Sequence, residues 1–477
     1  DKILYPFYLK DLNKGLVTRD KAKFLLKEFL KSLHKGFNYK SNVLLGDTGQ
    51  VIVLGGKSLE GHDDVNELSI LFLEVMGELK LPDPKIVLRV HKNISSEVWD
   101  KSFALLSKGL GYPLFSNDEV MIPALQEFGY KIEDAYNYVV SACWEPHIPG
   151  VSFDQNNIYN LNLLEPLIRL FDKKEIINEI ESFEEFFKYY KFELKEYLTK
   201  ILKKLENIKF MPSPLLSLLT GCHTKDISTG GSRYNHMGIL TVGLSNIVNS
   251  LLNIKRWIEN KIINFEQLKK VLENDFVDNI ELWYDAKNKG LKFGDDEEEV
   301  VKISNEIMDV IINFLEGKKN ILGGKYKIGY SSPSFVESAK GLMATPDGRR
   351  KNEPLGVHIS YSGNNANYLG LFNFSSKLNY KKAFNGAVTD IIIEKNFFKE
   401  NIFIFNKVFQ VFFDKGGAQL QVNILDYKEL FDAFKNPDKY PDLIVRVWGF
   451  SSYFKDLPEE YKKLILDRAI KYEYFNY

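Results

Sequence analysis

A cysteine and a glutamate stand two residues apart at Cys143 and Glu145, in the run Ser141-Ala142-Cys143-Trp144-Glu145-Pro146. Residues 138–141 read as a short strand, and side chains two apart at the end of a strand can face the same cavity. A thiol would then lie beside a carboxylate that can act in acid–base chemistry. The alternative is a small, buried and inert cysteine, because free cysteines are often buried.

A single glycine, Gly449, lies between two bulky aromatic residues in the run Arg446-Val447-Trp448-Gly449-Phe450-Ser451. The pattern predicts a strand that delivers this glycine into a loop. One interpretation is that Gly449 is a turn glycine, which supplies a positive φ. The other interpretation is that the glycine has a chemical role. This short run alone does not decide between the two.

Composition narrows the possible functions. The chain has 477 residues, 44% of them hydrophobic, with 63 basic and 64 acidic residues, so no charge excess indicates a nucleic acid partner. Two cysteines cannot build a four-cysteine zinc or iron–sulfur site, and the seven histidines show no metal-binding spacing. The few cysteines suit a reducing cytosol, and no apolar run reaches the roughly 18–20 residues that span a bilayer. We therefore expect a cytoplasmic protein that binds no metal, nucleic acid or membrane.

Elements that could position Cys143 and Gly449 follow from the hydrophobic periodicity. The pattern predicts strands at 51–54, 85–90, 138–141, 419–424 and 443–447. It predicts helices at 20–35, 64–79, 95–109, 118–128, 239–261, 296–316, 400–413, 427–434 and 458–472, with a helical period through 158–206. Short strands separated by helices are typical of an α/β barrel or sheet.

Six or more segments resemble, in the same order, motifs of the glycyl radical enzymes. The run around Gly449 is similar to their C-terminal radical motif, and the run around Cys143 is similar to the C-x-E loop of their dehydratase, lyase and decarboxylase branch. The other segments are Asn117-Asp118-Glu119, Thr229-Gly230-Gly231-Ser232-Arg233-Tyr234-Asn235, Thr345-Pro346-Asp347-Gly348-Arg349 with Glu353-Pro354-Leu355, and Gly416-Gly417-Ala418-Gln419-Leu420-Gln421-Val422-Asn423.

The resemblance implies a mechanism. A separate activating enzyme that uses S-adenosylmethionine and an iron–sulfur cluster would remove a hydrogen atom from Gly449, so this chain itself would bind no cofactor. The glycyl radical, delocalised into both flanking amides, would generate a thiyl radical on Cys143. That thiyl would take hydrogen from a small substrate while Glu145 acts as base. Because oxygen cleaves a glycyl radical, the resemblance also implies an anaerobic setting.

The branch of the family is narrowed by the neighbours of Cys143. Pyruvate formate-lyase needs two adjacent cysteines, which are missing here. The resemblance therefore implies a lyase that eliminates water, an amine or sulfite from a small polar substrate. Diol dehydratases carry a second carboxylate twelve residues after the glutamate, where this chain has Asn157; Asp154 is a possible substitute. The alternatives are a radical decarboxylase of an arylacetate-like acid, which Trp144 and Trp448 favour, and a non-catalytic or split subunit.

The resemblance covers only the later part of the family's length. It implies part of a ten-stranded α/β barrel, surrounded by helices, in which the cysteine loop and the C-terminal glycine loop meet. We expect residues 1–400 to form the barrel portion, with the cysteine loop around 141–150, and residues 401–477 to form the glycyl radical domain. A partial barrel would expose strand edges and apolar surface. We therefore expect a complementary chain that supplies the N-terminal half, or a homo-oligomer.

Overall fold

The computed structural model describes residues 1–35, 49–141, 143–222, 224–363 and 367–473. They form two compact units. Unit 1 comprises Asp1–Pro146 and Val388–Tyr477, and unit 2 comprises His147–Ala387. Because unit 1 joins both ends of the chain, Cys143, Glu145 and Gly449 all belong to it. The division at residue 400 stays a prediction about segments of the chain.

Unit 1 is built on a five-stranded sheet with the order β1-β2-β3-β10-β9. Neighbouring strands are parallel except β3 and β10, which are antiparallel. Two strand pairs, β4 with β5 and β11 with β12, complete the unit's strands, and the second residue of β5 is the first residue of unit 2. The bounds are β1 Val51–Gly55, β2 Lys85–Val90, β3 Leu114–Asn117, β4 Val139–Val140, β5 Pro146–His147, β9 Val388–Glu394, β10 Gln419–Leu425, β11 Ile444–Arg446 and β12 Ser451–Tyr453.

Strand β10 has two different faces although all of its residues are buried. Because side chains alternate along a strand, Leu420, Val422 and Ile424 share one face, and Gln419, Gln421 and Asn423 share the other. Buried amides need hydrogen-bond partners, since an unpaired buried polar group costs about 1–3 kcal/mol. The polar face of β10 must therefore bond to neighbouring segments.

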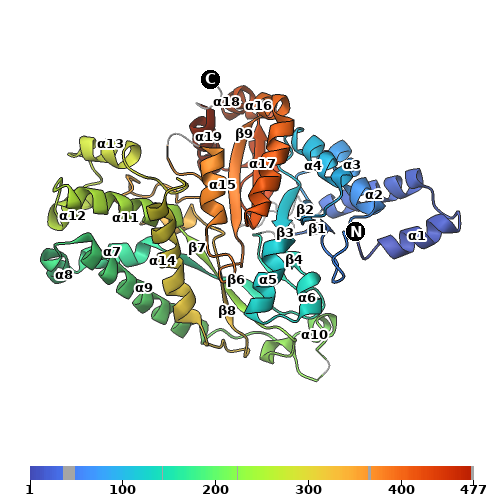
Figure 1. Cartoon of the computed structure of the whole chain (residues 1–477), viewed down its shortest axis with the longest axis horizontal. Coiled ribbons are helices and arrows are strands. Elements are labelled where there is room, and N and C mark those ends of the chain that lie inside the picture. Colours follow the sequence, from blue (N-terminus) through green and yellow to red (C-terminus); the bar gives the residue numbers. More distant parts are fainter. Residues whose placement is uncertain (36–48, 142, 223, 364–366, 474–477) are drawn as a thin grey trace. The chain divides into compact units, whose positions relative to one another are not determined.

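Helices cover this sheet. The Thr18 side chain caps α2 by accepting a hydrogen bond from the Lys21 N–H at 3.2 Å, a role for which threonine is a preferred residue. Helices α16, α18 and α19 gather at one end of β9 (Figure 1), and α19 packs on both β9 and α18. The helices of unit 1 are α1 Tyr5–Asn13, α2 Arg19–His34, α3 Glu67–Leu79, α4 Ser96–Leu106, α5 Asp118–Phe128, α6 Ile132–Tyr136, α16 Lys395–Glu400, α17 Ile402–Asp414, α18 Tyr427–Lys435 and α19 Glu459–Glu473.

Unit 2 is built on a parallel three-stranded sheet with the order β6-β7-β8. Its strands are β6 Gln155–Asn162, β7 Met237–Val242 and β8 Tyr326–Gly329. Its helices are α7 Leu164–Asp172, α8 Lys174–Glu179, α9 Phe183–Leu205, α10 Pro214–Leu219, α11 Leu244–Glu259, α12 Phe265–Glu273, α13 Ile280–Asn288, α14 Glu298–Leu315 and α15 Tyr368–Ser376.

Two predicted helical stretches are wrong at their starts. The helical period expected through 158–206 begins with strand β6, whose sequence QNNIYNLN is too polar to show an alternating strand pattern. In the stretch 239–261, where a helix is expected, the first residues belong to strand β7. Helix α11 begins only after Gly243, whose φ of 78° lies outside both the strand and the helix regions. The predicted strands at 51–54, 85–90 and 419–424 are confirmed.

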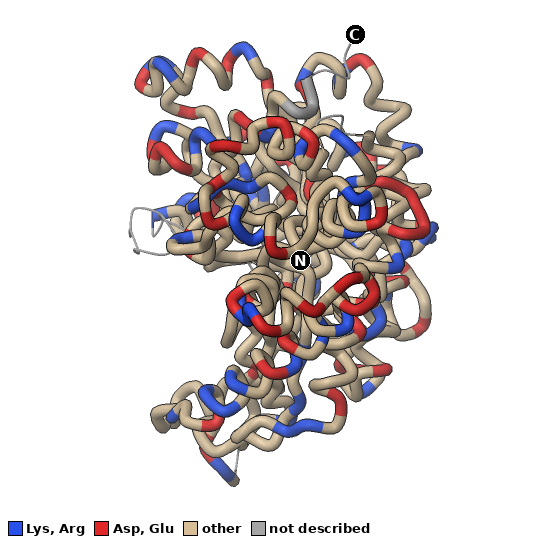
Figure 2. Tube along the Cα trace, turned by 90° about the vertical axis from the view of Figure 1, so that its left-hand side faces the viewer, with Lys and Arg blue, Asp and Glu red and all other residues tan. Residues whose placement is uncertain are grey.

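Charge and hydropathy fit the composition. Figure 2 shows basic and acidic residues interspersed along the trace, in keeping with a net charge of −1. Among the helices that the structure describes, none is both long and apolar enough to span a membrane. Each unit combines a sheet with surrounding helices, which confirms the α/β class.

Candidate active site

The cysteine loop is a tight turn between β4 and β5. The Trp144 N–H donates to the Ser141 carbonyl at 3.0 Å, and the Ser141 N–H donates to the Glu145 carbonyl at 2.9 Å. Trp144 has a φ of 76°, which is uncommon for a residue other than glycine. A backbone held in this region needs strong fixation by its surroundings, and such residues cluster at functional sites.

The side chains of the turn differ in exposure. Glu145 is 2% exposed, while Cys143 is half-buried and forms no disulfide. The Ser141 hydroxyl donates a hydrogen bond to the Glu145 carboxylate. Cys143 and Glu145 therefore lie in one short turn, and a serine that the sequence interpretation did not single out orients the carboxylate.

The glycine loop is the tip of a β-hairpin. Arg446 pairs with Ser451, and the Val447 N–H donates to the Phe450 carbonyl at 3.0 Å, so Trp448 and Gly449 form the tip. Both tip residues are buried, although most connecting segments run over the surface. Gly449 is not among the described glycines that have a positive φ. The backbone thus gives no reason for a glycine of the turn-forming kind at this position.

Aromatic rings enclose the tip. The rings of Trp448 and Phe450 lie edge to face, 5.4 Å apart at an interplanar angle of 83°. Trp448 is 3% exposed and Phe450 is 1% exposed. Gly449, which lies between these two residues in the chain, is buried as well.

The polar face of β10 bonds to both loops. The Gln419 side chain donates to the Trp144 carbonyl at 2.9 Å, on the cysteine loop. The Gln421 side-chain oxygen accepts from the Trp144 indole N–H at 3.4 Å and from the Arg446 Nε–H at 2.9 Å. Gln421 therefore joins the cysteine loop to the strand that leads to Gly449.

Asn423 completes this attachment. Its side-chain oxygen accepts from the Arg446 N–H at 2.8 Å, and its amide nitrogen donates to the Arg446 carbonyl at 2.9 Å. Residues 419 and 423 are four apart on one strand, which corresponds to about 13 Å. Both loops are thus anchored to one short stretch of the same strand face.

A buried ion pair supports the strand that enters the cysteine loop. Arg89 on β2 donates to both carboxylate oxygens of Asp118, at 2.8 and 2.9 Å. The Tyr138 hydroxyl donates to Asp118 at 2.8 Å, and the Arg89 guanidinium lies 4.1 Å from the centre of the Tyr138 ring. Burial and the Asp118 charge raise the pKa of Tyr138 well above its usual value. Tyr138 therefore stays protonated, and it directly precedes β4.

Residues of unit 2 that the sequence drew attention to have other surroundings. The Asp154 side chain is fully buried and accepts from the Lys327 ammonium at 3.1 Å and from the His236 N–H at 2.7 Å. Asp154 is therefore held in a buried ion pair, and its role as a substitute for the missing acid stays a prediction. The Arg349 guanidinium bonds to carbonyls of its own loop, which fits a structural role.

Sequence reasoning missed the residues that connect the loops. The residues Ser141, Arg89 and Tyr138 were given no role, and the amides of β10 appeared only as part of a motif. A buried strand with amides at every second position is a usable signal, because such amides must find partners. The described residues contain no cluster of three histidine, cysteine or acidic side chains placed to hold a metal ion.

Comparison with known proteins gives consistent matches. Residues 1–336 match the model of a family described as pyruvate formate lyase-like, and residues 361–455 match a model described as glycine radical. The chain is 28% identical to trans-4-hydroxy-L-proline dehydratase from Clostridioides difficile and covers 63% of that protein with 98% of its own residues. It is 25% identical to isethionate sulfite-lyase from Oleidesulfovibrio alaskensis, with 98% of this chain and 61% of that protein covered.

A solved structure is also similar. The glycerol-bound form of the B12-independent glycerol dehydratase from Clostridium butyricum matches with a TM-score of 0.89 and 30% identity, over 98% of this chain and 63% of that chain. The chain therefore spans less than two thirds of the length of each of these proteins.

Proposed function

Because this chain belongs to the pyruvate formate lyase-like family of glycyl radical enzymes and has that family's α/β barrel fold, we propose that it is a glycyl radical lyase. Gly449 stores the radical, Cys143 carries it to the substrate and Glu145 is the base. The observation that carries this proposal is the joint attachment of the Cys143 turn and the Gly449 hairpin to the polar face of β10. The reaction takes place in the cytoplasm of an anaerobic cell.

The radical moves by hydrogen-atom transfers. The Gly449 α-carbon takes the hydrogen atom of the Cys143 thiol, which leaves a thiyl radical and restores an ordinary glycine. The thiyl then takes a hydrogen atom from a carbon of the substrate, and the substrate radical loses its leaving group. The product radical finally takes the hydrogen back from Cys143, so the thiyl and then the glycyl radical are regenerated.

Glu145 removes a proton from the substrate during the abstraction. Its burial and its hydrogen bond from Ser141 fix the carboxylate two residues from the thiol. A base must be held within hydrogen-bond reach of the proton that it removes. The cost of a misplaced carboxylate is large, since a shift of about 1 Å can cost about a hundredfold in rate.

The substrate is a small polar molecule that loses water, an amine or sulfite. The names of the two similar proteins, a dehydratase and a sulfite-lyase, support this range. Asn157 cannot donate a proton as a carboxylic acid does, so a leaving group that departs without protonation suits this chain better than a hydroxyl. A radical decarboxylase of an arylacetate-like acid is the second candidate, favoured by the buried indoles of Trp144 and Trp448, which are 1% and 3% exposed.

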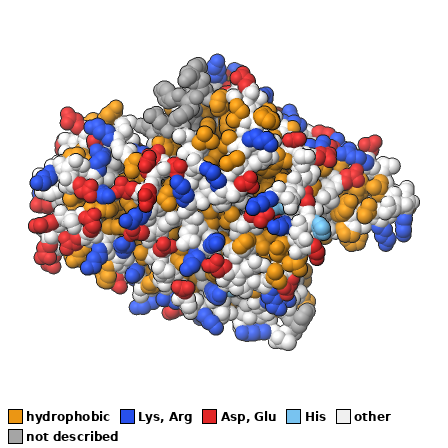
Figure 3. All heavy atoms as spheres, viewed as in Figure 1, with side chains coloured by type: hydrophobic (Ala, Val, Ile, Leu, Met, Phe, Trp, Pro, Cys, Tyr) orange, Lys and Arg blue, Asp and Glu red, His pale blue; other side chains and the backbone are white. Residues whose placement is uncertain are grey.

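Two partners belong to the proposal. An activating enzyme that uses S-adenosylmethionine and an iron–sulfur cluster removes the Gly449 hydrogen atom. A second polypeptide, either a complementary chain or another copy of this one, covers the apolar side chains exposed on and beside α1 and α2 (Figure 3), among them Ile3, Phe7 and Leu16, which are 81%, 68% and 71% exposed. Light scattering that finds a stable lone monomer at micromolar concentration would count against the second partner.

Electron paramagnetic resonance tests the radical assignment. The chain is incubated without oxygen with an activating enzyme of the family, and its spectrum is compared with those of Gly449→Ala and Cys143→Ser. We expect a carbon-centred doublet for the parent protein and for Cys143→Ser, and no doublet for Gly449→Ala. Only the parent protein should turn over a substrate.

Two outcomes contradict the proposal. A doublet that persists in Gly449→Ala would place the radical elsewhere. The second outcome is the absence of any doublet, when the activating enzyme works on a related protein and any co-purifying chain is present. That result would mean that this chain does not form a glycyl radical. Release of CO2 from an arylacetate would select the decarboxylase over the lyase.

A further inference from the structure

Unit 1 contains a second feature, a cavity of about 860 Å³. Its walls come from the ends of α3 and α4, the start of α16, the end of β10 and the base of the β11–β12 hairpin. Pockets for small molecules usually measure about 300–1,000 Å³. The cavity is thus large enough for a metabolite.

The cavity lies where α/β sheets commonly hold ligands. Strands β9 and β10 are parallel and end side by side, with Glu394 paired to Leu425. The residues that directly follow them, Lys395 and Asp426, line the cavity. The strand on the other side of β10, β3, runs in the opposite direction. Ligands of α/β proteins commonly bind outside the carboxyl ends of parallel strands.

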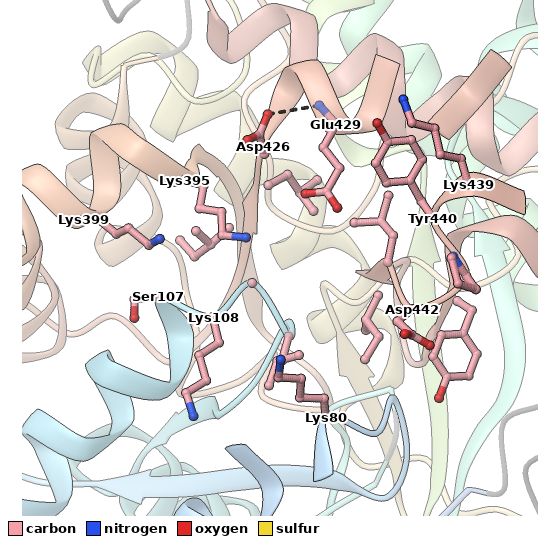
Figure 4. A pocket seen from close by; sticks show the side chains of 18 of the residues that line it. Lys80, Ser107, Lys108, Lys395, Lys399, Asp426, Glu429, Lys439, Tyr440 and Asp442 are labelled. Atoms are coloured by element: carbon pink, nitrogen blue, oxygen red, sulfur yellow. Dashed lines mark hydrogen bonds between the residues drawn. The ribbon is translucent and has the colours of Figure 1, made fainter. Parts of the chain in front are cut away.

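One side of the cavity is basic. Lys80, Lys395 and Lys399 line it, and no ion pair joins any of them to a described carboxylate. Lys395 and Lys399 are four residues apart in α16, and Figure 4 shows their side chains extending into the cavity from that helix. Like charges at this spacing repel each other by roughly 0.2–0.5 kcal/mol. A bound anion would remove this repulsion.

The other side carries two carboxylates, and its one lysine, Lys439, is already paired with Asp432. Glu429 and Asp442 line it together with the aromatic ring of Tyr440, and Figure 4 shows the Glu429 carboxylate directed into the cavity. Asp426 is occupied as the cap of α18, because its side chain accepts from the Glu429 N–H at 3.0 Å. Glu429 itself has no ion pair with a described lysine. Opposite charges therefore line the same cavity without meeting.

We propose that this cavity binds an organic phosphate whose far end carries hydroxyl or amino groups. The phosphate lies between Lys395, Lys399 and Lys80, and the donors at the far end bond to Glu429 and Asp442. A molecule with both parts spans the two charged walls, whereas an inorganic anion satisfies only one. Since Ile444 and Tyr453 of the hairpin also line the cavity, the bound molecule contacts the base of the hairpin that carries Gly449.

Calorimetry on the full chain tests this site with AMP as the probe, and with inorganic phosphate and adenosine as its two halves. We expect AMP to bind at least tenfold more tightly than either half. The double variant Lys395→Ala, Lys399→Ala should weaken AMP binding at least tenfold. Lys428→Ala, which removes an exposed lysine of α18 that does not line the cavity, should leave it unchanged.

Hydrogen exchange of residues 443–453 gives a second measurement that needs no enzymatic activity. Bound AMP should slow exchange in the hairpin of the parent protein and not in the double lysine variant. Equal binding of AMP to the parent and to the double variant would overturn the proposal, as would the absence of AMP binding. Binding of phosphate as tight as that of AMP would reduce the site to a simple anion site and overturn the proposed ligand class.

Discussion

At the scale of single residues, the cysteine turn depends on a side chain that chemistry alone does not reveal. Ser141 donates to the Glu145 carboxylate while its backbone bonds to both Trp144 and Glu145. The sequence could predict that Cys143 and Glu145 lie close together in one loop, because their spacing is local; that they face one cavity stays a prediction. It could not predict which hydroxyl orients the carboxylate, because a turn geometry with positive φ at a tryptophan has no clear signal.

Ser141→Ala should therefore lower kcat about tenfold, which corresponds to about 1.4 kcal/mol. Ser141 is a positioning residue, so Ser141→Thr, which keeps a hydroxyl, should restore most of the rate. Steady-state kinetics and thermal unfolding are measured together. If Ser141→Thr does not restore the rate, the hydroxyl does not act through Glu145. The same conclusion follows if the loss of rate in Ser141→Ala is accompanied by a matching loss of thermal stability.

At the scale of elements, β10 is the part that makes one site from two loops. Its strand was predicted correctly from the alternating pattern of residues 419–424. Its neighbours in the sheet were not, because β3 is only four residues long and β9 carries a buried acid, Asp390, within an apolar run. Strand order depends on contacts between distant segments, and periodicity contains no information about those.

Gln421→Leu removes the acceptor for both the Arg446 Nε–H and the Trp144 indole. Arg446 is 1% exposed, and breaking a buried bond to a charge costs about 3 kcal/mol. We expect a matching loss in the free energy of unfolding, measured with urea, and loss of the radical signal after activation. The half-buried Gln126 on α5 provides the control, since Gln126→Leu should change neither quantity.

At the scale of the whole molecule, stability should depend on pH through a buried histidine. Burial lowers the pKa of His236 from 6.5 to about 4. Between these values the unfolded chain binds a proton that the folded protein does not, so stability increases with pH across this window. The difference of about 2.5 pH units corresponds to about 3 kcal/mol.

The free energy of unfolding is measured from pH 4 to pH 7 for the parent protein and for His236→Asn. Asparagine can still accept the hydrogen bond that the Lys325 N–H donates to His236 at 3.0 Å. Across this pH window, we expect the free energy of unfolding to increase by about 3 kcal/mol less in His236→Asn than in the parent protein. Parallel curves for the two proteins would mean that His236 binds a proton equally well in the folded and unfolded states, and would contradict the lowered pKa.

The position of Arg468 has a consequence for damaged molecules. Arg468 on α19 donates to Asp390 on β9 at 2.7 Å, and burial raises the pKa of that acid. If Gly449 stores the radical as proposed, oxygen that reacts with it would cut the chain there, and α19 would no longer be covalently joined to the sheet. Once this tail separates, the buried Asp390 loses its ion pair with Arg468. We expect a cell to recognise such a molecule as unfolded and degrade it, so that inactivated copies do not accumulate and compete for the activating enzyme.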